Sequence, residues 1–368
     1  MSETETFDVL ILGAGIAGLS AADALIQNNT RCAVIDVNEP GSGTSGAPLM
    51  LLNPATGRRA KMAWRVEECM KASMEILGRV QKETRKPFFE ANGVIRPALT
   101  PELAEDFQRS PQKYDWPDSD WVQWLDKETF NQKYPVFKNH SGGLVVKNGA
   151  TVNGAVYMQS LSNYLVDRGV KTFYNCSYTL ERTQSGWGII LADGKILTSK
   201  KVLFATGHAI DQSSYWSFLP VHCVKGQTAT FHFKKSLPLE SSVSSLGYIA
   251  YMPEYPDKLV AGSTYEHHYE NLEPDEQGLN YLKKKMENVL PGLAEEAEST
   301  EQWAGVRVTT SDRHPVLGEH PEQEGLYVFT ALGSKGLITA RYAAEILADH
   351  IVSGKDVDDE LSVKRFIK

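Results

Sequence analysis

Three glycines near the N-terminus, Gly13, Gly15 and Gly18, have the spacing of a phosphate cradle. In this G-x-G-x-x-G pattern the first glycine permits a tight turn, the second lets the backbone approach a pyrophosphate, and the third lets a helix pack against a strand. Free N–H groups at the start of the following helix would face the anion. Asp36 stands 18 residues after Gly18, close to the spacing of about 20 at which an acid binds the ribose of an adenosine. These residues predict a dinucleotide site.

A strand, a turn and a helix must position this cradle. Residues 7–12 form an apolar run, residues 16–26 have helical periodicity, and residues 31–35 form a second apolar run that ends at Asp36. Glycines can fall at this spacing by chance in an ordinary turn. The flanking strands and helix favour the dinucleotide site.

The loop after Asp36 is dense in Gly, Ser, Thr and Pro. It is either an ordinary surface connection or a second cradle, in which Ser42, Thr44, Ser45 and the glycine amides donate hydrogen bonds. Its position just after the second strand favours the cradle. Residues 61–85 then predict a long amphipathic helix.

The rest of the chain alternates between segments of helix and strand and segments rich in short strands. Residues 86–150 read as short strands with a tryptophan-rich insertion, which either packs in a core or covers a planar cofactor ring. Residues 151–207 return to helix and strand, and their last strand ends at the small residues Ala205, Thr206 and Gly207, which leave room for a ligand. Residues 208–300 are rich in β-structure, and residues 301–350 supply a strand, a glycine turn and a closing helix. The chain therefore enters each of two domains repeatedly.

Composition excludes several classes of function. The 368 residues carry a net charge of −8 without a long basic run, which argues against a nucleic-acid surface or a membrane-surface helix. The four cysteines are far apart and form no C-x-x-C, so we expect reduced thiols in a cytoplasmic protein, and neither a signal peptide nor a membrane span is expected. His267 and His268 are adjacent and lack metal-ligand spacing, so no metal is proposed.

Motifs that the sequence lacks limit which molecules could donate electrons to the cofactor. Only one G-x-G-x-x-G directly follows an apolar strand and opens a helix, and no C-x-x-C occurs, so a second dinucleotide domain for NAD(P)H and a disulfide relay are unsupported. We therefore expect electrons to come from an organic substrate.

Several motifs together resemble the D-amino-acid oxidase (DAO) family of FAD enzymes. They are the glycine finger, Ala205-Thr206-Gly207, Lys225-Gly226-Gln227, the run from Trp303 to Pro315 (WAGVRVTTSDRHP) and the turn from Gly333 to Gly336. Within this family the C-terminal run is similar to glycine oxidase and to the oxidase half of the bifunctional enzyme that processes carboxymethylaminomethyl uridine in tRNA. The resemblance covers nearly the whole chain and implies noncovalent FAD as the cofactor.

The resemblance also implies that Arg307 binds the substrate carboxylate, because the family's arginine stands at this point of its W-A-G-x-R motif. A guanidinium offers a planar fork that matches a carboxylate bidentately. The alternative is a surface arginine paired with an acid such as Asp312.

Two further features of the pocket follow from the family. The turn before the last helix is expected to aim the positive end of that helix at the flavin, and Lys335 either adds a full charge there or is a solvated turn lysine. Tyr248 and Tyr251 lie where relatives often have a pocket tyrosine, and either hydroxyl is a candidate to bind the carboxylate, with simple packing as the alternative.

Two departures from relatives concern the flavin. Covalently flavinylated sarcosine oxidases carry a cysteine near the position of Gly305, whereas this chain has none after Cys223. They also carry a lysine on the strand that here reads Leu259-Val260-Ala261, where this chain has apolar side chains instead. Fast reaction of the reduced flavin with oxygen is therefore not implied, and the electron acceptor is either oxygen or another carrier.

The sequence as a whole predicts an α/β fold, in which an FAD-binding Rossmann-like domain is interleaved with an α+β substrate domain on a mostly antiparallel sheet. The expected FAD domain comprises 1–85, 151–220 and 301–368, and the substrate domain comprises 86–150 and 221–300. The expected reaction is oxidation of the C–N bond of a small amino acid or N-substituted glycine by hydride transfer to flavin. The alternatives are a tRNA carboxymethyl oxidase, a non-enzymatic flavin scaffold and a nicotinamide dehydrogenase.

The candidate site residues fall into two sets. Those expected to bind substrate or act in catalysis are Arg307, Tyr248, Tyr251 and Lys335. Those expected to contact FAD are Gly13, Gly15, Ile16, Ala17, Gly18, Asp36, Val37, Thr44, Ser45, Gly46, Leu51, Leu52, Ala205, Thr206, Gly207, Arg307, Gly333, Ser334, Lys335, Gly336 and Leu337.

Overall fold

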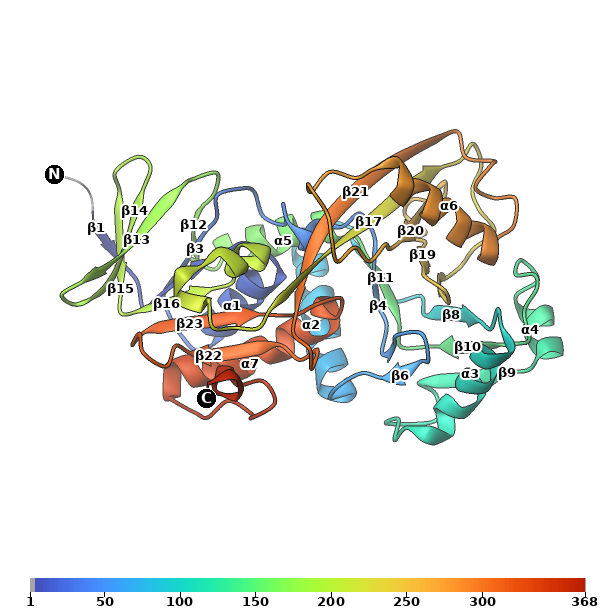
Figure 1. Ribbon diagram of the computed structural model, residues 1–368, viewed down its shortest axis with the longest axis horizontal. Coiled ribbons are helices and arrows are strands. Elements are labelled where there is room, and N and C mark those ends of the chain that lie inside the picture. The colour runs from blue at the N-terminus through green and yellow to red at the C-terminus, as the bar shows by residue number, and fades with distance from the viewer. Residues whose placement is uncertain (1–3, 368) are drawn as a thin grey trace.

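The glycine finger lies at the centre of a six-stranded sheet in the computed structural model, which describes residues 4–367 (Figure 1). The strand order is β12-β3-β2-β16-β23-β22, in which the first five strands are parallel and β22 pairs antiparallel with β23. Their bounds are Lys171–Phe173, Cys32–Ile35, Val9–Leu12, Lys201–Phe204, Leu326–Thr330 and Val316–Glu319. This confirms the expected parallel sheet.

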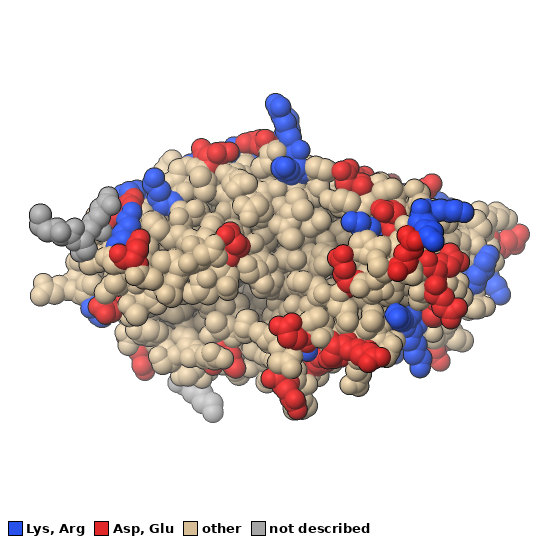
Figure 2. Space-filling view, turned by 90° about the horizontal axis from the view of Figure 1, so that it is seen from above, with Lys and Arg blue, Asp and Glu red and all other residues tan. Residues whose placement is uncertain are grey.

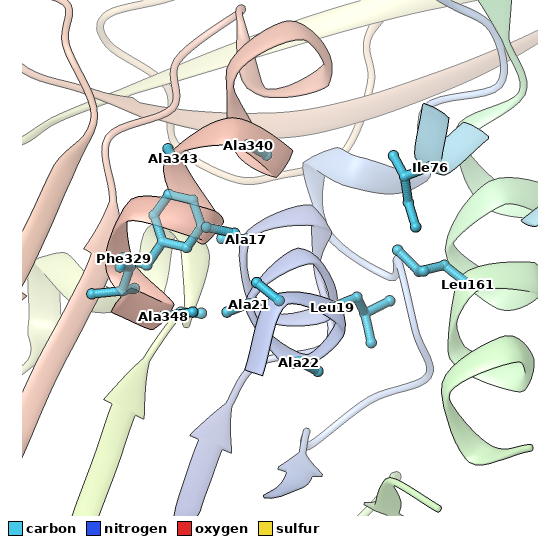
Figure 3. Packing of buried hydrophobic residues seen from close by; sticks show 14 of the residues in the cluster. Ala17, Leu19, Ala21, Ala22, Ile76, Leu161, Phe329, Ala340, Ala343 and Ala348 are labelled. Carbon is cyan, nitrogen blue, oxygen red and sulfur yellow. The ribbon is translucent and has the colours of Figure 1, made fainter. Parts of the chain in front are cut away.

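Four helices pack around this sheet: α1 (Ile16–Gln27), α2 (Val66–Thr84), α5 (Gly154–Val166) and α7 (Gly336–Ser353). The face of α1 that bears Ala17 and Ala21 lies against α7 and Phe329 of β23, and α7 contributes the small residues Ala340, Ala343 and Ala348 (Figure 3). Because the distance between packed helices depends on the side chains at the contact, the alanines let α1 and α7 approach closely. Leu19 points from the opposite side of α1 toward Ile76 and Leu161.

A second, four-stranded sheet covers one end of this domain, at the left of Figure 1. Its order is β1-β15-β14-β13, and the turn between β14 and β15 contains Gly194 at φ +85°, as the sequence predicts for a hairpin. The bounds are Thr4–Thr6, Ile196–Ser199, Gly186–Leu191 and Tyr178–Thr183. Trp187, which is 1% exposed, joins this sheet to the main one.

The other end of the molecule is built on an eight-stranded sheet of order β21-β17-β20-β19-β18-β8-β10-β9. Neighbouring strands are antiparallel except β18 and β8. β17 and β21 pair over their whole length and extend from the first domain into the second (Figure 1). The bounds are Ser299–Thr309, His222–His232, Lys258–Gly262, Tyr248–Ala250, Ser242–Ser244, Val94–Pro97, Gly143–Val146 and Val122–Leu125.

Three helices, two small sheets and four 3₁₀ turns make up the remaining elements of residues 4–367. Helices α3 (Pro101–Lys113), α4 (Lys127–Lys133) and α6 (Glu276–Val289) belong to the second domain, and Phe107, Phe130 and Leu282 are their buried anchors. The small sheets are β4-β11-β7 (Met50–Leu52, Ala150–Val152, Phe89–Glu90) and β5-β6 (Ala55–Thr56, Lys61–Met62). The 3₁₀ turns are η1 (Thr44–Gly46), η2 (Gly207–Gln212), η3 (Ser214–Trp216) and η4 (Val363–Phe366).

The structure corrects two expectations about the elements and leads us to propose one different domain boundary. The helix predicted from residue 61 begins at Val66, because Lys61–Met62 pairs with Ala55–Thr56 as a hairpin. The region 86–150 contains two helices besides its strands. The predicted domain boundary at 301 falls inside β21, a strand of the second sheet, so we draw that boundary after Thr309.

The Trp-rich insertion is used for packing. Trp116 and Trp121 lie with ring centroids 6.3 Å apart, and Trp121 is 8% exposed in a hydrophobic cluster. None of the helices formed by residues 4–367 has the length and hydropathy needed to cross a bilayer.

Candidate cofactor and substrate site

The glycine finger is closed so tightly that only glycine fits at two of its positions. A Cβ on Gly13, whose φ is +110°, would come 2.3 Å from the carbonyl oxygen of Ala205 at the end of β16. A Cβ on Gly18 would come 1.9 Å from the carbonyl oxygen of Gly13. The turn therefore brings β2, α1 and the end of β16 into direct contact.

The N-terminus of α1 is bordered by two loops that the sequence assigns to cofactor binding. Ser45 Oγ accepts a hydrogen bond from the Ile16 N–H at 2.9 Å, and Asp36 Oδ2 accepts one from the Ala14 N–H at 2.6 Å. Gly15 is the N-cap and offers no side-chain cap. Backbone N–H groups and the positive end of the helix dipole thus meet at one place, as an anion site requires.

Asp36 is half-buried at the end of β3, where its Oδ1 also accepts a hydrogen bond from the Asn38 N–H at 2.9 Å. Burial raises the pKa of this carboxyl, and the hydrogen bonds from backbone N–H groups oppose that shift. The next residue, Val37, is 53% exposed. The acid is thereby fixed beside the glycine turn, where a ribose would follow the pyrophosphate.

The 44–46 loop connects the cofactor cradle to the second domain. Thr44 Oγ1 donates a hydrogen bond to the carbonyl oxygen of Val306, and a Cβ on Gly305 would come 3.1 Å from the Cα of Thr44. Gly46 is held against Gly41, whose carbonyl oxygen would be 2.0 Å from a Cβ at residue 46. The loop thus contacts β21 one residue before Arg307.

Two predicted FAD contacts on β4 differ in their exposure. Leu51 is half-buried, whereas Leu52 is 0% exposed in the main hydrophobic cluster. Because Leu52 pairs with Ala150 and faces that core, it has no surface for a ligand. We therefore remove Leu52 from the candidate set.

The turn from Gly333 to Gly336 brings a second helix N-terminus to the same place. The Gly333 N–H donates to the carbonyl oxygen of Val308 at 2.8 Å, and a Cβ on Gly336 would lie 3.4 Å from Ile16 Cγ2. The N-terminal ends of α1 and α7 therefore adjoin. In this turn Ser334 is exposed and Leu337 half-buried, while across the sheet edge Thr206 is half-buried and Gly207 exposed.

Lys335 is half-buried, which differs from a freely solvated turn lysine. Burial lowers the pKa of its ammonium, and the nearby charges of Arg313 and Lys61 lower it further. These three side chains give the mouth of the α7 turn a local positive charge in a chain of net charge −8.

Arg307 lies on β21 without an acidic partner among residues 4–367. Its Nη2 donates to Ser263 Oγ at 2.7 Å, its Nη1 donates to the Thr264 carbonyl oxygen at 3.3 Å, and its guanidinium lies 4.7 Å from the ring centroid of Tyr265. The alternative pairing with Asp312 is wrong, because Asp312 pairs with Arg365 at 2.9 Å.

Tyr248 lies on the same face of the sheet as Arg307. It pairs across strands with Gly262, over which its ring lies, and its hydroxyl donates to the Leu49 carbonyl oxygen at 3.2 Å. Burial raises the pKa of this phenol, and the charge of Arg307 opposes that shift, so the two groups are close enough to interact.

Tyr251, the other candidate, lies on the opposite side. It is 5% exposed in the cluster beneath α6, together with Ile249 and Leu259. Side chains three residues apart on a strand point to opposite faces. Its proposed role beside Arg307 is therefore wrong.

Sequence reasoning missed a buried polar network behind Arg307. Gln227 Nε2 donates to Glu266 at 3.0 Å and to Asp275 at 2.9 Å, and Lys225, which is 3% exposed, donates to the Glu273 carbonyl oxygen at 2.6 Å. Asp275 also caps α6. The network contacts the segment 263–275, which supplies the hydrogen-bond acceptors of Arg307 found among residues 4–367, Ser263 and Thr264. The sequence held one signal for this network: Lys225 and Gln227 flank Gly226 on a strand, so their polar side chains point to the same face.

Ser263 and Lys285 were also missed. Lys285 extends from α6 and donates to the Ser263 carbonyl oxygen at 2.8 Å, while the Ser263 hydroxyl binds Arg307. No motif connects these three positions in the sequence.

The observed geometry fits an FAD molecule by its chemistry. Two helix N-termini, the Ser45 loop and the half-buried Asp36 meet at one place, where the helix ends suit a pyrophosphate and the carboxylate suits a ribose. β21 and β19 face this cradle with Arg307 and Tyr248, so an acid bound there lies on the cofactor side of the second sheet.

Comparison with known proteins agrees with this geometry. The family described as "DAO: FAD dependent oxidoreductase" matches residues 8–350. The tRNA 5-methylaminomethyl-2-thiouridine biosynthesis bifunctional protein MnmC of Idiomarina loihiensis is 29% identical over 98% of this chain, which spans 59% of that protein. The glycine oxidase of Geobacillus kaustophilus is 24% identical over 98% of this chain and 96% of its own length.

Solved structures share the fold over nearly the whole chain. The glycine oxidase from Geobacillus kaustophilus has a TM-score of 0.82 at 23% identity and covers 96% of both chains. The iminodiacetate oxidase from Chelativorans sp. BNC1 has a TM-score of 0.79 at 22% identity and covers 97% of this chain and 98% of its own.

Proposed function

The chain belongs to the DAO family of FAD-dependent oxidoreductases, and we propose that it oxidises the C–N bond of a small amino acid or an N-substituted glycine. The single observation that supports this substrate class best is Arg307, a half-buried guanidinium without an acidic partner among residues 4–367, directed to the cofactor side of the second sheet. A carboxylate is the natural ligand for such a group, because the planar fork binds both oxygens.

The chain's own residues orient the substrate. Arg307 holds the carboxylate, and its bonds to Ser263 and Thr264 restrict where the guanidinium can move. The Tyr248 ring lies on the same face of the sheet, and its hydroxyl keeps its proton because burial raises its pKa, and donates that proton to the Leu49 carbonyl oxygen. Bound noncovalently, FAD supplies the hydride acceptor. No protein base need remove the α-proton if the amine binds uncharged.

Anaerobic reduction of the purified flavoprotein tests this proposal. Loss of the yellow colour is followed with glycine, sarcosine, alanine, proline and their N-methyl derivatives, each without oxygen. Bleaching by at least one small amino acid or N-substituted glycine is expected. A flavin that stays oxidised with every member of the panel contradicts the proposal.

A second candidate is oxidation of a carboxymethylaminomethyl group on tRNA. The 29% identity to MnmC over nearly the whole chain favours it. The net charge of −8 opposes it, because polyanion binding depends on displacing cations with Lys and Arg. On the face shown in Figure 2 the Lys and Arg side chains lie scattered among Asp and Glu rather than in one patch. Retention on immobilised tRNA at physiological salt would support this candidate.

We propose a cytoplasmic location and oxygen or another carrier as the oxidant. The four cysteines form no disulfide in the described part of the chain, as a reducing compartment requires. Comparing reoxidation of the reduced protein by oxygen and by a soluble quinone identifies the oxidant class.

A further inference from the structure

Two cationic side chains from distant parts of the chain are attached to one residue, Ser263. The Ser263 hydroxyl accepts a hydrogen bond from Arg307 Nη2 at 2.7 Å, and the Ser263 carbonyl oxygen accepts one from Lys285 Nζ at 2.8 Å. Arg307 comes from β21 and Lys285 from α6. The guanidinium and the ammonium are therefore held side by side at the edge of the proposed substrate site.

The stem of Lys285 is guided toward this edge by its neighbours. A Cβ on Gly247 would lie 2.8 Å from Lys285 Cδ, so only glycine leaves room for the stem there. Gly247 directly precedes Tyr248, whose ring faces the cofactor side. The ammonium also lies 4.6 Å from the ring centroid of Tyr281. These contacts hold the ammonium against the Ser263 carbonyl oxygen and the Tyr281 ring, with the stem beside Gly247.

Neither cation is neutralised by an acid within residues 4–367. Lys225, on the opposite face of the sheet, has Glu266 at 3.6 Å and Asp275 at 3.8 Å, whereas no carboxylate lies within ion-pair distance of Lys285 or Arg307. Burial lowers the pKa of Lys285 to about 8, and the charge of Arg307 contributes to that shift. Two adjacent uncompensated cations repel each other, and an anion that contacts both removes the repulsion.

We propose that Lys285 binds a second acidic group of the substrate, so that the preferred substrate is an amino acid or N-substituted glycine with two carboxylates. The proposal rests on the oxidase function above. Ser263 and Thr264 take two of the five N–H donors of Arg307, which leaves three for the first carboxylate, and the ammonium of Lys285 has three donors, of which Ser263 takes one. The two donors that remain match the oxygens of a second carboxylate.

Binding of two inert acids to the FAD-loaded enzyme tests the proposal. Oxydiacetate has two carboxylates and methoxyacetate has one, and both carry an ether oxygen where the substrate has its amine. Dissociation constants are measured by perturbation of the flavin absorbance. We expect oxydiacetate to bind at least about tenfold more tightly, the ratio that a charged hydrogen bond at a partly buried site supplies.

Substitutions in α6 distinguish the effect of the Lys285 charge from a general effect of changing the helix. Lys285→Met is expected to abolish most of the preference for oxydiacetate, and Lys285→Arg to keep it. Lys284→Met removes an exposed lysine one residue earlier and serves as the matched control, which keeps the parent ratio. If Lys285→Met does not fold, the ratio of the two dissociation constants in the parent and in Lys285→Arg still tests the proposal.

Equal affinities for the two acids in the parent, or an unchanged ratio in Lys285→Met, would overturn the proposal. Failure of the oxidase function has a different signature, because neither acid would then perturb the flavin and no amine would reduce it. A protein that binds methoxyacetate and is reduced by a monocarboxylic amine, but gains nothing from the second carboxylate, refutes the role of Lys285 alone.

Discussion

The guanidinium of Arg307 lies directly over Gly226 on the neighbouring strand, where a Cβ would come 2.1 Å from Nη2 and 2.4 Å from Nη1. The register explains this contact, because Val224 opposes Arg307 and Gly226 opposes Gly305, so all four residues share one face. The absence of a side chain at residue 226 lets the guanidinium lie flat against the sheet. Its orientation is therefore set by a glycine as much as by its hydrogen bonds.

The first prediction follows from this contact. Gly226→Ala is expected to displace the guanidinium and to lower kcat/KM for the substrate found in the flavin-reduction assay by roughly 100-fold, the cost typical of a misplacement of about 1 Å. FAD content should stay at the parent level, because residue 226 makes no contact with the glycine finger. Steady-state kinetics and the flavin-to-protein absorbance ratio are the measurements.

Gly78→Ala is the matched control, since a Cβ there would have nothing within 4 Å. In the interior of α2 this substitution is expected to raise the free energy of unfolding by about 0.5–1 kcal/mol and to leave kcat/KM alone. If Gly226→Ala retains parent kinetics, the contact with Arg307 has no role in orientation.

Arg307 itself gives the second prediction. Arg307→Ala is expected to lose about 2–5 kcal/mol of transition-state stabilisation, read from kcat/KM, because it removes a partly buried charge that orients the substrate acid. Arg307→Lys should recover only part of this, because an ammonium cannot bind both carboxylate oxygens in one plane. Affinity for methoxyacetate, measured by flavin absorbance, should fall in parallel. Unchanged turnover on every amine that the parent oxidises would remove Arg307 from the site.

The sequence predicts the glycine finger well and the substrate side poorly, for a physical reason. Gly13, Gly18 and Asp36 act within one strand–turn–helix–strand unit, so spacing alone carries the geometry. Ser263 and Lys285 meet Arg307 only through antiparallel pairing of β17 with β20 and β21 and through the packing of α6. Such long-range pairing leaves no periodic signal in the sequence.

For the two candidate tyrosines, the sequence alone contains enough information to choose between them. Tyr248 and Tyr251 are three positions apart, so strand alternation alone requires them to face opposite sides, and only one could have joined Arg307. The domain boundary that we propose after Thr309, in place of residue 301, had no comparable signal, because the run that contains Arg307 reads as a buried strand of either sheet.

The third prediction concerns the cofactor. Asp36→Asn is expected to weaken FAD binding by about 1.5–3 kcal/mol, because a charge-assisted acceptor for a ribose hydroxyl is lost. Since burial raises the pKa of this carboxyl, FAD affinity of the parent should begin to fall at a higher pH than for an ordinary aspartate as the solution is acidified. Titration of the apoprotein with FAD, followed by flavin fluorescence, measures both effects. Glu39→Gln, three residues later and exposed, should bind FAD normally.

The fourth prediction addresses the network behind Arg307. Lys225→Met is expected to cost about 1–3 kcal/mol of unfolding free energy, because Glu273 loses its donor and two partly exposed acids lose their counter-charge. Thermal unfolding measures this loss. Hydrogen exchange should quicken in 263–275, and methoxyacetate should bind more weakly because the partners of Arg307 lie in that segment.

Lys234→Met controls for the loss of a lysine as such. Lys234 pairs with Glu298 at 3.0 Å with its side chain 77% exposed, and surface pairs of this kind contribute about 0–1 kcal/mol. Fast exchange confined to other segments in Lys225→Met would show that the network does not hold the loop.

The last prediction is the pH dependence of the second carboxylate site. The charged or titratable groups placed against Lys285 are Arg307 and Tyr281, and burial followed by the Arg307 charge lowers its pKa from 10.5 to about 8. Below pH 8 the ammonium is charged and binds oxydiacetate. As pH rises through 8 it loses its proton, so oxydiacetate affinity should fall by up to about tenfold per pH unit, while methoxyacetate, held by an arginine that stays charged, should change little. Between pH 8 and 10.5 the unfolded chain binds a proton that the folded one does not, so this lysine makes folding stability rise with pH there. Dissociation constants for both acids from pH 6.5 to 9.5 decide the matter, since a flat oxydiacetate-to-methoxyacetate ratio means that Lys285 does not bind the second acid.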